Sequence, residues 1–290
     1  MRAAGHMHVT LVTSGIDVTR AAGTVEFNVL ILEPETRRLS IREVKERSMT
    51  LADDIAGWIR DQVRGAGLDG AVLGLSGGID SAVVSGLCAR GLGKENVLGI
   101  IMPIHSMSLD AQYGEDAARA WDIEYRTFDL APVYDALIGM FPPGSELANA
   151  NLKPRLRMMT LYHHANTLNR MVIGTGNRSE LMIGYFTKYG DAGVDLLPIA
   201  SLYKHQVRDL AREIGVPKPI IDRAPSAGLW EGQTDETDMG VTYGELDRIL
   251  AAIIDGKTPD GDSAAIERVQ RMHRGSEHKR HLPPIYQPTS

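Results

Sequence analysis

From about residue 50 onward, the sequence alternates segments typical of buried strands with segments that have helical spacing. The predicted strands cover residues 71–75, 97–102, 124–128 and 171–175. The predicted helices around them cover residues 51–63, 81–90, 110–121 and 153–170. Strands that are separated by helices usually pair in parallel, and the helices then cover both faces of the sheet. We therefore predict an α/β fold with a Rossmann-like parallel sheet and helices on both faces.

Residues 1–48 have a different pattern and are predicted to form a small β extension. Apolar and polar residues alternate at residues 8–15 and 24–44, where Val, Thr and Ile are frequent. The sequence EPET at residues 33–36 is typical of a hairpin turn between two strands. The predicted domains are therefore an N-terminal β extension of unknown role at residues 1–48 and a main domain at residues 49–290.

Charge and cysteine content limit the partners that we expect. The chain has 31 Lys and Arg against 37 Asp and Glu, a net charge of −6, whereas nucleic-acid surfaces are strongly basic. Cys88 is the single cysteine, so no internal disulfide is possible and a cytoplasmic location is expected. No apolar run approaches the ~20 residues of a membrane helix. We expect small-molecule partners, with neither nucleic acid nor membrane.

The sequence SGGIDS at residues 76–81 directly follows the first predicted strand of the sheet, and a helix begins within it. Its two glycines let the backbone approach a ligand, and the free N–H groups of a helix start favour an anion. The hydroxyls of Ser76 and Ser81 can donate to phosphate oxygens, and Asp80 indicates a Mg²⁺ that bridges to the phosphates. Ligands of such sheets bind beyond the carboxyl ends of the strands, so we predict a nucleotide site here.

Other phosphate loops fit this sequence less well. There is no GxxxxGK[ST] motif, and GTGNRS at residues 174–179 matches GxGxxG only in part and follows the fourth strand. A glycine-rich turn with Asp80 as a helix cap is the purely structural alternative. The order strand, SGGxDS, helix resembles the loop of the PP-loop ATP pyrophosphatases. This resemblance implies an adenine nucleotide alpha-hydrolase-like fold and cleavage of ATP between its α and β phosphates.

Two longer segments narrow the resemblance. NLKPRLRMMTLYHHANTLN at residues 151–169 and VIGTGNRSELMIGYFTKYGDAGVDLLPIASLYKHQV at residues 172–207 are similar to ammonia-dependent NAD synthetases, as is HKR at residues 278–280. The similarity runs from about residue 50 to about residue 283. It implies ATP-dependent amidation of deamido-NAD (nicotinate adenine dinucleotide) with ammonia through an acyl-adenylate. The products are NAD, AMP and pyrophosphate, in the last step of NAD biosynthesis.

The implied reaction explains why such a site needs several kinds of side chain. A carboxylate is a poor electrophile, and its adenylation turns the departing oxygen into part of AMP, which leaves readily. The site needs a metal and cations to screen the phosphates, an aromatic side chain beside the pyridine ring, and a dry place for ammonia.

The resemblance implies catalytic and nucleotide contacts at numbered positions. Asp80 and Glu180 are the implied Mg²⁺ ligands, and Asp191 is the implied site that holds ammonium and accepts its proton. The implied ATP contacts are Gly74, Leu75, Ser76, Gly77, Gly78, Ile79, Asp80, Ser81, Thr175, Lys204 and Ser226. The family usually has Thr at the last of these positions, and Ser226 keeps the hydroxyl.

The resemblance also implies a site for the second nucleotide. The implied deamido-NAD contacts are Arg155, Tyr162, Lys188, Asp195, His278 and Lys279. Because Arg155 and Tyr162 are seven residues apart on one helix, we expect a cation and an aromatic ring on the same face. Pro154 replaces the small residue common in the family, and proline is tolerated in a first helical turn. The family is dimeric with a shared dinucleotide site, so a homodimer is implied.

Three alternatives keep part of this interpretation. A tRNA-thiolating PP-loop enzyme needs a sulfur-handling cysteine and a basic RNA surface, whereas we expect Cys88 to be buried. A nucleotide-binding sensor needs no second metal ligand, so Glu180 speaks against it. A glutamine-dependent synthetase carries an amidase domain with a nucleophilic cysteine, which residues 1–48 lack.

We also predict that residues 224–237, with Trp230, form a lid over the bound nucleotide.

Overall fold

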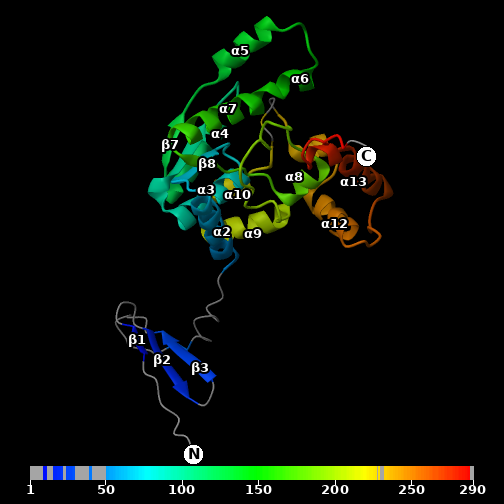
Figure 1. Ribbon diagram of the computed structural model, residues 1–290. Helices are drawn as coiled ribbons and strands as arrows, with labels where there is room; N and C mark the ends of the chain where they lie inside the picture. Colours follow the sequence, from blue (N-terminus) through cyan, green and yellow to red (C-terminus); the bar gives the residue numbers. More distant parts are fainter. Residues whose placement is uncertain are drawn as a thin grey trace, which may run out of the picture. The chain divides into compact units, whose positions relative to one another are not determined.

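The computed structural model describes residues 50–226, 228 and 232–287, together with the backbone of four strands within residues 9–40. The chain divides into two units, Met1–Leu51 and Ala52–Ser290, which are both drawn in Figure 1. Two features predicted from the sequence lie outside the described residues. These are the turn at residues 33–36 and the central part of the predicted lid, including Trp230.

The N-terminal unit contains an antiparallel sheet. Its strands are β1 (Val9–Leu11), β2 (Ile16–Ala21), β3 (Thr24–Val29) and β4 (Leu39–Ser40), in the order β1-β2-β3-β4. Strands β1, β3 and β4 lie in the two segments where the alternation of apolar and polar residues predicts β structure, whereas β2 lies between these segments. The role of this unit and its boundary at residue 48 remain predictions.

The second unit is built on a four-stranded parallel sheet. Its strands are β5 (Gly70–Gly74), β6 (Val97–Ile101), β7 (Glu124–Thr127) and β8 (Arg170–Val172), in the order β7-β6-β5-β8. The predicted parallel sheet is therefore confirmed. Strand β8 ends at Val172, earlier than predicted. Beyond it Ile173 forms a single parallel bridge with Leu196, and the Gly174 N–H donates to the Leu196 carbonyl oxygen at 2.8 Å.

Helices cover both faces of this sheet, as the continuous apolar strands predict. Ala71 and Leu73 of β5 belong to one apolar cluster, and Val72 between them belongs to another, with all three fully buried. The first cluster includes side chains of α2 (Leu51–Gly65), α3 (Ile79–Leu92), α4 (Ser108–Trp121), α9 (Lys204–Ile214) and α10 (Lys218–Asp222). The second cluster includes side chains of α7 (Leu152–Thr167). Both faces of the sheet are therefore buried at β5, whereas β7 at the edge is mostly exposed.

Short elements complete the connections around the sheet. A 3₁₀ turn, η1 (Lys94–Asn96), precedes β6, and α5 (Ala131–Met140) and α6 (Glu146–Ala150) both pack against α7. Cys88 in α3 is fully buried, as expected. No helix among the described residues is long and apolar enough to cross a membrane.

A third apolar cluster joins helices in the second half of the chain, where the sequence analysis assigned few elements. It consists of α8 (Arg178–Ile183), α12 (Tyr243–Ile254) and α13 (Ser263–Gly275), with α11 (Asp235–Met239) contributing Met239. Figure 1 shows α12 and α13 beside α8, and the 3₁₀ turn η2 (Glu277–Lys279) follows α13. This cluster holds α8 against its neighbours at the end of the fourth strand.

Candidate active site

A cavity of about 1120 Å³ lies at the carboxyl ends of β5, β6 and β8. The strand ends contribute Gly74, Ile101 and Ile173 to its wall. Segments from later in the chain close the other sides, among them residues 184–187 and residues 223–226. The cavity therefore lies where parallel sheets bind their ligands.

The SGGIDS loop forms one wall of this cavity, with Ser76, Gly78, Ile79 and Asp80 exposed to it. Helix α3 begins directly after Gly78, and no side chain caps its first N–H groups. Such uncapped groups favour an anion. The Ser81 hydroxyl donates instead to the Gly78 carbonyl oxygen at 2.9 Å, so it holds the loop rather than lining the cavity.

Gly77 is required by the backbone of this loop. Its φ is +77°, and a Cβ there would lie 2.4 Å from the carbonyl oxygen of Asp110. We expect Gly77→Ala to lower the free energy of unfolding by about 1–3 kcal/mol from strain. Displacement of the loop should lower kcat/KM about a hundredfold. Denaturant unfolding measures the first effect, and steady-state kinetics measure the second.

Gly65→Ala on α2 is the matched control, because a Cβ there meets nothing within 4 Å. Equal stability and equal kcat/KM of the two variants would contradict the prediction.

Asp80 and Glu180 meet on opposite sides of one lysine, Lys204. The Lys204 Nζ lies 2.6 Å from Asp80 Oδ2 and 3.0 Å from Glu180 Oε1. Asn177 caps α8 and contacts both carboxylates: its Nδ2 donates to Asp80 Oδ1 at 3.0 Å, and its backbone N–H donates to Glu180 Oε2 at 3.5 Å. Its side-chain oxygen accepts from the Glu180 N–H at 3.1 Å. Two residues 100 positions apart in sequence thus share one polar cluster.

Burial perturbs the charges in this cluster. Lys204 is only 2% exposed; burial by itself lowers its pKa, but Asp80 and Glu180 outweigh this and raise the pKa above its ordinary value. Burial raises the pKa of Glu180 to about 7, although the Lys204 charge opposes that rise. The arrangement therefore favours a further positive charge beside the two carboxylates.

The donor set fits a magnesium ion that is shared with phosphates. Mg²⁺ in nucleotide sites is usually held by one or two carboxylates and by phosphate oxygens. Asp80 and Glu180 supply two carboxylates beside the uncapped start of α3. Within the described part of the chain, no group of three or more His, Cys, Asp or Glu side chains could hold a metal by itself. A metal here would need the phosphates as further ligands.

Asp191 lies in the wall of the same cavity, and its role toward ammonia stays a prediction. Its Oδ1 accepts from the Thr187 N–H at 2.8 Å. Desolvation raises the pKa of its carboxyl, although the bond from Thr187 opposes this rise. The predicted ATP contacts Thr175 and Ser226 also line the cavity.

Most of the predicted deamido-NAD contacts do not line this cavity. Lys279 does line it, and its Nζ donates to the carbonyl oxygens of Gly184 and Phe186 at 2.7 and 2.8 Å. The predicted contacts that lie outside the cavity wall are Arg155, Tyr162, Lys188, Asp195 and His278. Their roles remain predictions.

These five residues outside the cavity form hydrogen bonds with one another or with each other's backbone. The Tyr162 hydroxyl donates to Asp195 Oδ1 at 2.8 Å, and Asp195 Oδ2 accepts from the Val172 N–H at 2.9 Å. Arg155 donates to the Lys188 carbonyl oxygen at 3.3 Å, and Lys188 Nζ donates to that of His278 at 2.7 Å. The five residues therefore form two hydrogen-bonded groups, Tyr162 with Asp195 and Arg155 with Lys188 and His278, which we call the outer polar surface.

Sequence reasoning missed several residues that line or support the cavity. Arg157 lines it and donates from Nε to the Met102 carbonyl oxygen at 3.1 Å, at the end of β6. Asp235 lines it as well, and Tyr243 donates to Glu180. Arg157 is two positions from Arg155, a spacing that places the two side chains on different faces of α7, so Arg155 gave no signal for it. Nothing local to residues 235 and 243 pointed to this site either.

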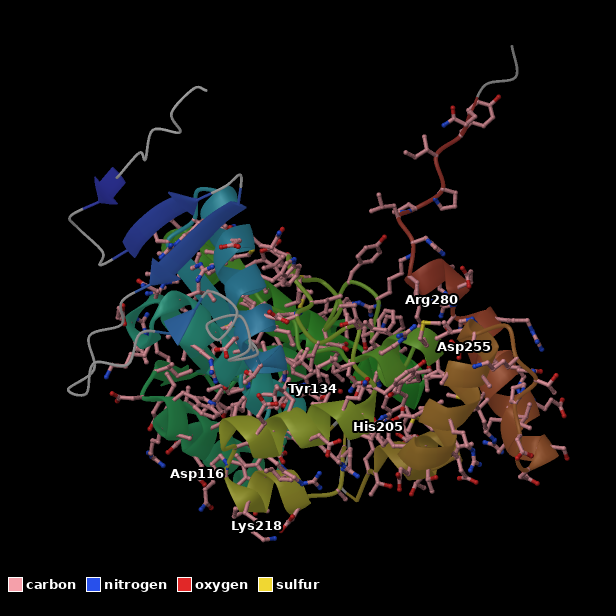
Figure 2. The ribbon with its side chains drawn as sticks, turned by 90° about the horizontal axis from the view of Figure 1, so that it is seen from below. Asp116, Tyr134, His205, Lys218, Asp255 and Arg280 are labelled. Carbon is pink, nitrogen blue, oxygen red and sulfur yellow. The ribbon has the colours of Figure 1, made fainter. Side chains whose placement is uncertain are left out.

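Asp247 of α12 was also not predicted, because its contacts join residues that are far apart in the sequence. Its side chain accepts from the Ser179 hydroxyl and from the His205 N–H, and lies 2.8 Å from His205 Nδ1. The Ser179 oxygen accepts from the Lys204 N–H at 2.9 Å. One buried carboxylate thus fixes the starts of α8 and α9; His205 is labelled in Figure 2.

The C-terminal segment holds the other end of α8. Arg280 donates from Nη1 to the Met182 carbonyl oxygen at 2.9 Å, and His273 Nδ1 lies 2.7 Å from the same oxygen. Figure 2 shows Arg280 beside the last helices, before the chain leads away from them. The predicted HKR motif therefore supports the cavity wall through two of its three residues, Lys279 and Arg280.

Comparison with known proteins gives one consistent result. A family model described as NAD synthase matches residues 51–283. A protein of Archaeoglobus fulgidus named NH(3)-dependent NAD(+) synthetase is 47% identical over 81% of this chain and 95% of its own length. A protein of Methanosarcina mazei with the same name is 46% identical over 80% and 95%.

Solved structures agree with the sequence matches. The NMN synthetase from Francisella tularensis is 40% identical, with a TM-score of 0.75, and the match covers 81% of this chain and 97% of that one. The NH3-dependent NAD synthetase from Campylobacter jejuni is 29% identical, with a TM-score of 0.71 and coverage of 82% and 99%. The match to the family model begins at residue 51, so residues 1–48 lie outside it.

Proposed function

The chain belongs to the NAD synthase family, and from this premise we propose that it joins ammonia to the nicotinate carboxylate of deamido-NAD. ATP is the co-substrate, and AMP and pyrophosphate are the other products. The observation that carries the proposal is the joint placement of the uncapped α3 start, two carboxylates and a lysine in one cavity. A tRNA-thiolating enzyme and a non-catalytic sensor are not favoured.

The first half of the reaction uses the phosphate loop. A carboxylate oxygen of the substrate attacks the α phosphorus of ATP, and pyrophosphate leaves. The α3 N–H groups, Ser76 and Lys204 bind the phosphates, and Thr175 and Ser226 hold the rest of the nucleotide. Asp80 and Glu180 would hold a Mg²⁺, which when bound neutralises charge on the phosphates.

The second half of the reaction forms the amide. We propose that Asp191, which lines the cavity, binds ammonium and accepts its proton, so that neutral ammonia can attack. Ammonia attacks the acyl carbon of the adenylate and AMP leaves, and the second proton that the nitrogen loses passes to the AMP phosphate or to water. Lys279, which lines the same cavity, would contact the pyridine nucleotide.

The outer polar surface supports a place for the rest of the dinucleotide. Arg155, Lys188 and His278 are the cationic or ionisable groups there, and Tyr162 with Asp195 gives a ring and an acceptor. We further propose that the enzyme is a homodimer that completes this site, and that it acts in the cytoplasm. The buried, unpaired thiol of Cys88 suits a reducing compartment.

A second candidate is amidation of the nicotinate mononucleotide. The solved NMN synthetase from Francisella tularensis shares 40% identity with this chain, more than the Campylobacter jejuni NAD synthetase. Both candidates use the same cavity chemistry. They differ in whether the second nucleotide half is needed for turnover.

The test is product analysis by mass spectrometry with the purified full chain, ATP, Mg²⁺ and ammonium. We expect deamido-NAD to give NAD at a higher kcat/KM than nicotinate mononucleotide gives its amide. The reverse order would establish the second candidate, and ADP as the stoichiometric product would contradict both. With glutamine instead of ammonium, we expect negligible product, because no predicted amidase nucleophile is present in the chain.

A further inference from the structure

Tyr243, the first residue of α12, lies at the centre of the charged cluster although it does not line the cavity. It is only 3% exposed. Its hydroxyl lies 2.8 Å from Asp235 Oδ2 and 3.1 Å from Glu180 Oε1, and Lys204 Nζ lies 4.9 Å from the centre of its ring. One side chain therefore contacts the lysine and two buried carboxylates.

Asp235 connects this cluster to the segment that carries Ser226. Its own side chain is buried, with 4% exposed. Its N–H donates to the Pro225 carbonyl oxygen at 3.1 Å, and Pro225 directly precedes Ser226. A continuous series of hydrogen bonds thus leads from Glu180 through Tyr243 and Asp235 to the backbone beside Ser226.

The Tyr243 hydroxyl lies between two acidic side chains of this series, those of Asp235 and Glu180. Asp235 and Glu180 are both acidic and both removed from water, so without a donor between them they would repel each other. The hydroxyl has a single proton for two acceptors. Asp235 also accepts from the Tyr185 hydroxyl, and Glu180 also accepts from Lys204 and from the Asn177 N–H. A change at one carboxylate therefore alters the bond to the other.

We propose that Tyr243 is a positioning residue for the nucleotide, which holds the backbone at Ser226 in register with Glu180. The contact of Ser226 with ATP and the contact of Glu180 with the metal-bound phosphates then form together. The inference rests on the proposed function only in taking ATP as the ligand of this cavity. No residue of the series other than Glu180 and Ser226 touches the nucleotide in this account.

Tyr243→Phe tests the proposal, because it removes the hydroxyl and keeps the ring beside Lys204. Calorimetry with α,β-methylene ATP and Mg²⁺ should show affinity about tenfold lower, the effect of one hydrogen bond to a charged group. In kinetics, KM for ATP should rise by the same factor, while KM for the pyridine nucleotide stays within about twofold. Tyr125→Phe is the control, since that hydroxyl contacts Arg119 and Glu115 away from the cavity.

A double-mutant cycle with Ser226→Ala separates positioning from a general loss of stability. If Tyr243 acts through the Ser226 segment, Tyr243→Phe/Ser226→Ala should bind the analogue about as weakly as the weaker single variant. Fold-changes that multiply would overturn the proposal, as would equal affinity of Tyr243→Phe and the unmodified chain. If Tyr243→Phe does not fold, Asp235→Asn gives the same cycle from the other end of the series.

Different results would contradict the proposed amidation reaction and the proposed role of Tyr243. Failure of the proposed function appears as no amide product from the unmodified chain in the presence of ATP, Mg²⁺ and ammonium. Binding of the analogue needs no amidation, so the cycle still reports on Tyr243 in that case. Thermal unfolding of every variant shows that the affinities refer to folded protein.

Discussion

Glu180→Gln is expected to lower kcat/KM about a thousandfold with little change in fold stability. The variant loses one of the two carboxylates that would hold Mg²⁺, and the phosphate charge in the transition state is then less well screened. Because burial raises the pKa of Glu180 to about 7, the fold already disfavours the charged form at this position. A neutral side chain of the same shape should therefore change the free energy of unfolding by less than about 1 kcal/mol.

Steady-state kinetics and denaturant unfolding of the same preparation check this prediction. Glu213→Gln provides the matched control, because Glu213 is exposed on α9, outside the cavity. Asp80→Asn should behave like Glu180→Gln. Activity near normal in both variants would mean that the metal is held elsewhere.

Lys204→Met should have the second large effect, and this effect falls on stability as well as on activity. Removing the ammonium leaves Asp80 and Glu180 facing each other without their shared partner. Breaking a buried ion pair from one side costs about 3–5 kcal/mol. Loss of a cation for the phosphates should also lower kcat/KM about a hundredfold or more.

Mg²⁺ gives this variant a readout that does not depend on activity. With Lys204 removed, the two carboxylates have room for a divalent cation, so MgCl₂ alone should raise the Tm of Lys204→Met more than that of the unmodified chain. Lys218→Met is the control, because Lys218 lies in an exposed ion pair on α10. Equal Mg²⁺ effects on the Tm of all three proteins would contradict the placement of the metal between these carboxylates.

Some parts of the site could be predicted because the residues that form them lie next to one another in short sequence segments. SGGIDS follows a strand and begins a helix, which by itself sets the direction of the free N–H groups. The resemblance implied Glu180 as a metal ligand and Lys204 as an ATP contact, and in the structure the two side chains form an ion pair that was not predicted. The parallel sheet was equally predictable, since each strand and helix carries its own apolar pattern.

The supporting contacts could not be predicted, because they join residues that are distant in sequence. Asp247 contacts Ser179 across 68 positions, and Tyr243 contacts Glu180 across 63. Helix α8 has only six residues, too few to show a helical period. Its position depends on packing against α12 and α13, which no local pattern specifies.

For the predicted deamido-NAD contacts, the sequence could indicate a shared helix face but not what that face contacts. Arg155 and Tyr162 do share a helix, as their spacing predicts, but both contact the segment at residues 188–195 rather than the cavity. Spacing determines which residues share a helix face, whereas the neighbouring segments determine what that face meets. The predicted roles of these two residues therefore depend on the outer polar surface binding the dinucleotide.

The path of one carboxylate oxygen tests the proposed function most directly. Deamido-NAD labelled with ¹⁸O in its nicotinate carboxylate is incubated with the full chain, ATP, Mg²⁺ and ammonium, and the products are analysed by mass spectrometry. If the carboxylate attacks the α phosphorus, each AMP formed carries one labelled oxygen and pyrophosphate carries none. Label in pyrophosphate or inorganic phosphate, or unlabelled AMP, would contradict adenylation of the substrate in this cavity.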